Sequence, residues 1–243
     1  MRTRKKRTQS GFSLLEVTLS ILVLVVVMGA VFSQIDRVTK TTKRESMTTD
    51  LVQQNRDFVD LFVRDVHMTG YPHSAMYAIA PTPPCTPVPQ CDKSVAVGIV
   101  AASPTSLRLE GDVYGDGNVY SVLYTYYQVD PNVPPDPNCP CLRRSAVLKI
   151  SADPVNLQSP AQYYTEVQNI IDPTNMVQGI FTYFDAVGNA VAVGAGVDFE
   201  NNGATIQNID AIKVNLNVRS TQRDPQSGQL VVNSQAAVAE LEN

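Results

Sequence analysis

The most prominent pattern along the chain is an apolar run close to its N-terminus. Residues 12–32 form a stretch of 21 residues in which Glu16 is the only formally charged side chain. As an α-helix, this stretch spans roughly 30 Å, which is the hydrocarbon thickness of a bilayer. The pattern therefore predicts a membrane-spanning helix or an export signal, for which Val31-Phe32-Ser33 offers a signal-peptidase site.

The helical pattern continues beyond the apolar run. Between Ser13 and Met68 there is no proline and a single glycine, Gly29. Residues spaced by three or four mark one helix face in the second half, namely Met47, Leu51, Asn55, Phe58, Phe62 and Val66. Gly70 followed by Tyr71-Pro72 is a stop signal. We expect one helix of roughly 80 Å, with a membrane half and a half that packs on a head domain. A free coiled coil is the weaker alternative, because apolar heptads do not persist through residues 36–46.

Strand-like patterns replace the helical one after Pro72. Runs rich in Val, Ile, Tyr and Phe occupy residues 95–100, 119–129, 146–150, 177–184, 209–218 and 230–232. Residues 115–118, 187–189 and 201–203 carry Gly and Asn in positions typical of turns. We therefore predict an α+β fold, in which one long helix packs against an antiparallel sheet.

Charge is distributed unevenly along the chain. Five basic residues and no acid lie in residues 2–7, whereas the rest of the chain has 14 basic and 23 acidic residues. A protein with this excess of acidic residues outside its N-terminus is a poor partner for the phosphates of nucleic acids. Four more cations follow the apolar run at Arg37, Lys40, Lys43 and Arg44, so charge alone does not decide the orientation of the span.

Glu16 is the residue that makes the N-terminal run specific. A carboxylate inside a membrane helix is costly unless it is paired, and such groups are functional candidates. Residues 11–17 have the sequence GFSLLEV behind a short basic leader. This segment resembles the type III signal of type IV pilins and pseudopilins, and the match covers roughly the first 35 residues.

The resemblance implies a series of roles. A prepilin peptidase would cut after Gly11 and methylate the new N-terminus at Phe12, and Glu16 would attract the N-terminal amine of a neighbouring subunit. Partners implied are the prepilin peptidase, other major and minor pilins, an inner-membrane assembly platform and membrane lipid. The protein would cross the inner membrane once, with its head in the periplasm, and then enter a pilus on the cell surface. Many pilins carry a helix-breaking proline in the apolar segment, and this chain has none.

The rest of the chain most resembles the W-type minor pilins. That resemblance rests on residues 62–71 (FVRDVHMTGY), 109–118 (LEGDVYGDGN) and 180–185 (IFTYFD). It divides the chain into a leader (1–11), a membrane or filament-core helix (12–34), the head-packing half of the helix (35–71) and a β-rich head (72–243). J-type pseudopilins of type II secretion systems have a similar plan.

Four cysteines lie in two proline-rich loops. They are Cys85, Cys91, Cys139 and Cys141. In an oxidising compartment they favour disulfides, and the spacing of one residue between Cys139 and Cys141 disfavours a direct bond. We expect two bridges between the loops, with the connectivity left open. A zinc site is the alternative, but the C-x5-C and C-x-C spacings do not fit it well.

Other candidate chemistry is sparse. Asp112, Asp116 and Asn118 are a weak calcium candidate, because positions three and twelve of the calcium-loop pattern hold Tyr114 and Leu123. A hairpin turn between residues 107–110 and 119–127 explains the same residues without an ion. The only two histidines, His67 and His73, are too few for a metal site and are expected to be packing or surface residues.

The sequence predicts a non-enzymatic subunit without a cofactor. It contains no nucleophile elbow, phosphate-binding loop, dinucleotide fingerprint or zinc-protease motif. Our hypothesis is a minor type IV pilin that acts in pilus assembly initiation or in a tip complex. The alternatives are a J-type pseudopilin, an exported soluble binding or adhesive domain with an ordinary signal peptide, and a membrane-tethered enzyme.

Overall fold

The main element of the described structure is one long helix. The computed structural model describes residues 13–72, 93–128, 139–150, 162–171, 179–199 and 201–241. Its first element is α1 (Leu14–His67), 54 residues long, which confirms the expected long helix. Helix α1 ends as predicted: the N–H of Met68 donates to the carbonyl of Arg64, the N–H of Thr69 donates to that of Val66, and Gly70 follows with φ of 85°.

Two antiparallel sheets follow α1 in the described part of the chain. The six-stranded sheet has the order β5 (Tyr164–Val167), β4 (Cys141–Leu148), β3 (Tyr120–Tyr127), β2 (Ser106–Gly111), β1 (Ile99–Ala102) and β8 (Val197–Asp198). The four-stranded sheet has the order β10 (Leu230–Glu240), β9 (Ala211–Arg223), β6 (Phe181–Phe184) and β7 (Ala190–Val191). A short helix, α2 (Gly203–Gln207), precedes β9. The α+β class with a long helix on antiparallel strands is thus confirmed, and the strands are divided between two sheets.

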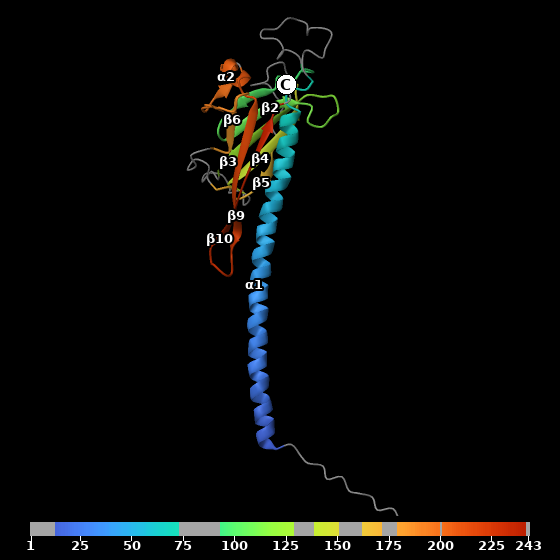
Figure 1. The fold of residues 1–243 in the computed structure, drawn as a ribbon. Coiled ribbons are helices and arrows are strands. Elements are labelled where there is room, and N and C mark those ends of the chain that lie inside the picture. The colour runs from blue at the N-terminus through green and yellow to red at the C-terminus, as the bar shows by residue number, and fades with distance from the viewer. Residues whose placement is uncertain are drawn as a thin grey trace, which may run out of the picture.

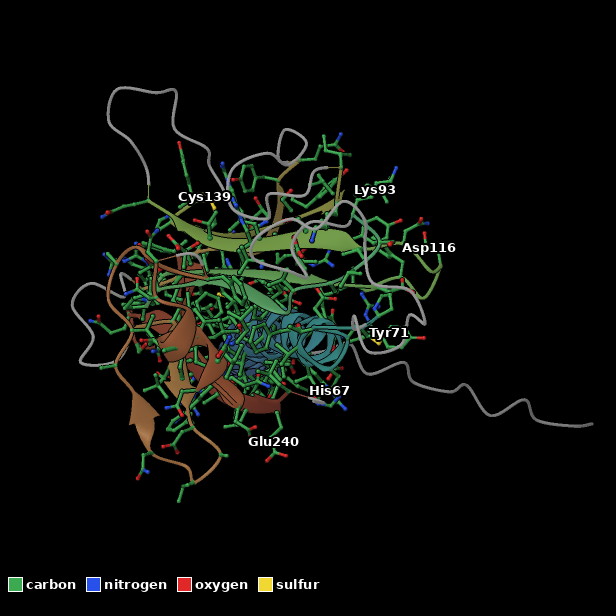
Figure 2. The ribbon with its side chains drawn as sticks, turned by 90° about the horizontal axis from the view of Figure 1, so that it is seen from above. His67, Tyr71, Lys93, Asp116, Cys139 and Glu240 are labelled. Atoms are coloured by element: carbon green, nitrogen blue, oxygen red, sulfur yellow. A yellow bond between two sulfur atoms is a disulfide. The ribbon has the colours of Figure 1, made fainter. Side chains whose placement is uncertain are left out.

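The two sheets enclose the C-terminal half of α1. Figure 2 looks along α1 and shows the helix between the green strands of the six-stranded sheet and the orange-brown strands of the four-stranded sheet. The ring of Phe62 stacks on Phe181 of β6 at 5.9 Å and meets the ring of Tyr124 of β3 edge-on at 5.6 Å. Each sheet has one apolar face, and both faces are buried against the same helix.

The buried face of α1 follows the predicted spacing. Leu51, Asn55, Phe58, Phe62, Asp65 and Val66 are buried, and Met47 is half-buried. Asp65 is also fully buried, although a charged helix residue is ordinarily found on the surface. Its Oδ2 accepts hydrogen bonds from Tyr124 Oη at 2.6 Å and from Arg144 Nε at 2.7 Å. Asp65 therefore joins α1 to β3 and β4, with its charge balanced by Arg144.

The predicted strands are correct in place but not in length. The sequence pattern located β3, β9 and the β2–β3 hairpin, but it gave only residues 230–232 for β10, which continues to Glu240. Residues 95–98 are not a strand, although they were predicted as one. Their position is set by a buried ion pair, in which Glu110 Oε2 accepts from Lys149 Nζ at 2.7 Å and from the N–H of Val97 at 3.1 Å.

The end of α1 lies directly against β2. Thr69 and Gly111 form an isolated bridge, and the N–H of Gly70 donates to the carbonyl of Glu110 at 2.8 Å. A Cβ on Gly111 would collide with the carbonyl oxygen of Met68. The absence of a side chain at Gly111 therefore permits the close approach of helix and sheet.

We expect Gly111→Ala to destabilise the head, because a backbone carbonyl cannot move aside as a side chain end can. Overpacking of this kind costs about 1–3 kcal/mol, or roughly 3–10 °C in melting temperature for a chain of this size. Thermal unfolding of the full chain in detergent measures the effect. Gly194→Ala is the matched control, since no atom lies within 4 Å of its added Cβ. Equal melting temperatures for the two variants would contradict this packing account.

Candidate functional site: the apolar half of α1

The N-terminal half of α1 projects away from both sheets. Figure 1 shows it extending below the head as a single bare helix. Its large apolar side chains are exposed, from Leu14, 82% exposed, to Val38, 62% exposed. We call residues 14–38 the apolar half of α1. It is long and apolar enough to cross a membrane, and an uncovered apolar surface of this extent indicates a lipid or protein environment.

The head first touches α1 beyond the apolar half. The turn between β9 and β10 reaches down along the helix (Figure 1), where Gln226 Nε2 donates to Thr41 Oγ1 at 3.1 Å. One turn further along α1, Arg44 lies 3.7 Å from the carboxylate of Asp224. Lys40 pairs with Asp36 on the helix itself at 2.7 Å. The Lys40–Asp36 pair is exposed and adds little stability, whereas the Asp224 carboxylate is buried. The bonds of Thr41 and Arg44 mark where contacts between α1 and the head begin.

Glu16 lies in the first turn of α1. Ser13 is the extended N-cap residue, and its carbonyl accepts the N–H groups of Glu16 and Val17. The pattern Ser13-x-x-Glu16 matches a capping box, yet the Ser13 side chain makes no capping hydrogen bond. The Glu16 side chain is exposed at the start of the apolar half. Gly11 and Phe12 lie outside the described residues.

The cysteine prediction is wrong in its pairing. Cys139 and Cys141 form a disulfide with each other, with their Cα atoms 4.3 Å apart, rather than two bonds to the other loop. Cys141 begins β4 opposite Tyr127 of β3, so the bond stabilises the start of that strand. Cys85 and Cys91 lie outside the described residues.

The three calcium candidates lie in the turn before β3. Asp112 accepts the N–H groups of Asp116 and Gly117, and Asp116 accepts the N–H of Asn118 and the hydroxyl of Tyr120. The hydrogen bond from Tyr120 holds the pKa of Asp116 below its usual range, and the same bond raises the pKa of Tyr120 to about 12. All four carboxylate oxygens thus have protein donors, as expected for a self-supporting turn.

The remaining polar residues that were candidates for a site do not lie together in the structure. His67 is exposed at the end of α1, and His73 lies outside the described residues. Across the described ranges, no group of three or more His, Cys, Asp or Glu side chains is placed to hold a metal ion. Asp116 and Cys139 lie at opposite ends of the six-stranded sheet (Figure 2). Among the described residues, the candidate functional site is therefore the apolar half of α1 together with Glu16.

Calcium should leave the stability of the protein unchanged, because the oxygens of Asp112 and Asp116 already accept hydrogen bonds. Thermal unfolding of the full chain with millimolar Ca²⁺ and with a chelator measures this. Asp112→Asn is the informative variant, since an amide removes one acceptor and should loosen the turn equally in both conditions. A saturable rise in melting temperature with Ca²⁺, lost in Asp112→Asn, would establish a calcium site instead.

Comparison with known protein families, with characterised proteins and with solved structures gave no match to this chain. The structure does show a long N-terminal apolar helix packed on antiparallel sheets, and this architecture is consistent with that of pilins.

Proposed function

We propose that the protein is a minor type IV pilin, a non-enzymatic subunit that takes part in pilus assembly initiation or in a tip complex. The observation that supports this most is the bare apolar half of α1, which begins within the GFSLLEV segment and ends before the first head contact at Thr41. A helix of this kind serves in a bilayer before assembly and in a helical filament core afterwards.

The position of Glu16 gives the proposal a mechanism. After cleavage behind Gly11, the new N-terminal amine belongs to Phe12, which precedes Glu16 by four residues in the sequence. In a filament core of low dielectric, an ammonium and a carboxylate interact far more strongly than in water. Leaving either charge unpaired there costs about 3–5 kcal/mol. Pairing Glu16 with the amine of a neighbour therefore favours one axial offset between subunits.

The continuity of α1 also bears on assembly. The helix runs from Leu14 to His67 without interruption, and Gly29 is its only glycine. We expect the subunit to enter the filament with this helix intact, because no proline removes a backbone hydrogen bond from it. The partners in this proposal are the prepilin peptidase, other pilins, the inner-membrane assembly platform and membrane lipid.

Glu16→Ala should be processed normally yet fail to assemble. The cleavage site is unchanged, but the neighbour's amine loses its counter-charge, so incorporation into sheared pili should fall more than tenfold. Immunoblots of the membrane and sheared fractions measure both steps. Glu45→Ala, on the exposed polar part of α1, is the matched control. Normal incorporation of Glu16→Ala would rule out the pairing role.

Gly11→Ala separates a pilin from an exported soluble protein. A side chain at the cleavage position should block the peptidase, so the uncut precursor should accumulate in the membrane and no protein should reach the pilus. Electrophoretic mobility of the protein beside wild type reports the cleavage. If the variant is cut and released like wild type, an ordinary signal peptide explains the N-terminus and the pilin proposal fails.

A further inference from the structure

The four-stranded sheet has one long open edge. Its edge strand β10 (Leu230–Glu240) has 11 residues, whereas the edge strands β7 and β8 have two residues each and β5 has four. Natural proteins keep exposed edge strands short, or interrupt them with proline or lysine, because an open edge recruits other strands. Residues 232–240 (VNSQAAVAE) contain no proline, lysine or arginine.

The register shows which backbone groups of β10 are open. On β9, Asn215 donates its N–H to Ile180, and Asn217 accepts the N–H of Ile171, so odd-numbered residues of β9 bond on the β6 side. Even-numbered residues of β9 therefore bond to β10, where Val214 faces Ala237 and Ile212 faces Ala239. Further along the same register, the N–H of Leu241 donates to the carbonyl of Asp210.

The even-numbered residues of β10 consequently direct both N–H and C=O outward. They are Val232, Ser234, Ala236, Val238 and Glu240. Among the residues that the structure describes, none donates to or accepts from these outward backbone groups. Their side chains are exposed as well, with Val232 at 54% and Val238 at 56%.

Helix α1 leaves this edge open. The contact between the two elements is made by the opposite face of β10, where Asn55 Nδ2 of α1 donates to Asn233 Oδ1 at 2.7 Å. Figure 2 shows Glu240, the last residue of β10, at the margin of the head and away from the six-stranded sheet. Five outward pairs of hydrogen-bonding groups thus form an edge that fits a strand from another chain.

A second copy of this chain does not fit the edge. Antiparallel pairing of β10 with its own copy requires a two-fold axis perpendicular to the strands. Because α1 runs alongside β10 (Figure 1), that axis would reverse the second α1, and the two helices could not enter one membrane in the same direction. The edges formed by β5, β7 and β8 are too short to match residues 232–240.

We propose that the open edge of β10 binds an edge strand of a different membrane-anchored subunit by β-strand addition. This inference rests on the proposed function, which places the protein beside other pilins. The open edge of β10 is then the surface that selects one neighbouring subunit over the others. The partner strand carries small or β-branched side chains beside Val232, Ala236 and Val238, where cross-strand packing stabilises the pair. It carries a cation beside Glu240.

Residue-resolved amide hydrogen exchange tests the proposal even while the partner is unidentified. The full chain is compared in detergent and in sheared pili or membrane-extracted assemblies. In detergent, amides 233, 235, 237 and 239 should exchange slowly and amides 232, 234, 236, 238 and 240 quickly. In the assembly, the even-numbered amides should slow by more than tenfold. Unchanged fast exchange at these positions in assembled, Phe12-processed protein would overturn the inference and leave the proposed function standing.

Two substitutions at one position probe the edge itself. Ala236→Lys adds an edge charge, and Ala236→Pro removes an outward N–H without removing a bond to β9. Both should keep the melting temperature of the monomer and reduce incorporation more than tenfold. Ala237→Pro removes an N–H that faces Val214 and should lower the melting temperature instead. Val187→Lys, at a turn residue that is 84% exposed, is the control that should assemble normally.

Replacing Val238 with the photo-reactive amino acid benzoylphenylalanine identifies the molecule that binds the open edge of β10. We expect a crosslink to an extended segment of a different subunit that has its own apolar N-terminal helix, and the crosslink should disappear in Ala236→Lys. A crosslink to this same chain would replace the proposed occupant with a second copy, and a crosslink to lipid would overturn strand addition. Absence of processed protein from every assembly would remove the proposed function and this inference together.

Discussion

Phe62 packs against both sheets at once, and the position of the head on α1 depends on that contact. Its ring is fully buried between Phe181 of β6 and Tyr124 of β3. Truncating a buried phenylalanine costs about 3–5 kcal/mol, a large part of the stability of an ordinary domain. One turn further along the helix, the Asp65 carboxylate joins β3 and β4. Because these contacts involve only the C-terminal half of α1, the other half is left uncovered by the head.

The division of α1 into two halves connects the fold with the proposed function. The C-terminal half is amphipathic and buries one face, whereas residues 14–38 are rich in apolar side chains that are exposed on every side. A helix that is apolar all round belongs in lipid or in a bundle of similar helices. A single carboxylate at Glu16 then has a large effect, since it is the one charge in the run of residues 12–32 and must find a counter-charge there.

The helix was predictable because its signals are local. The period of residues 47–66, the absence of proline and the Gly70-Tyr71-Pro72 stop lie in one contiguous segment. The features that sequence reasoning missed depend on contacts between distant residues. Asp65 is hydrophilic, and only the arrival of Arg144 and Tyr124 from β4 and β3 makes its burial tolerable. The length of β10 follows from pairing with β9, since its small and polar residues carry a weak strand signal. The Cys139–Cys141 bond depends on a local chain path that spacing alone does not give.

Pilin-type processing is measured by the intact mass and N-terminal sequence of the mature protein from a membrane fraction. We expect a chain that begins at Phe12, with one added methyl group on its N-terminal amine. A chain that begins at Gln34 would show that a conventional signal peptide had been removed, and a chain that begins at Met1 in a host with an active prepilin peptidase would show an ordinary membrane anchor. Either result would contradict the assignment of this protein as a pilin.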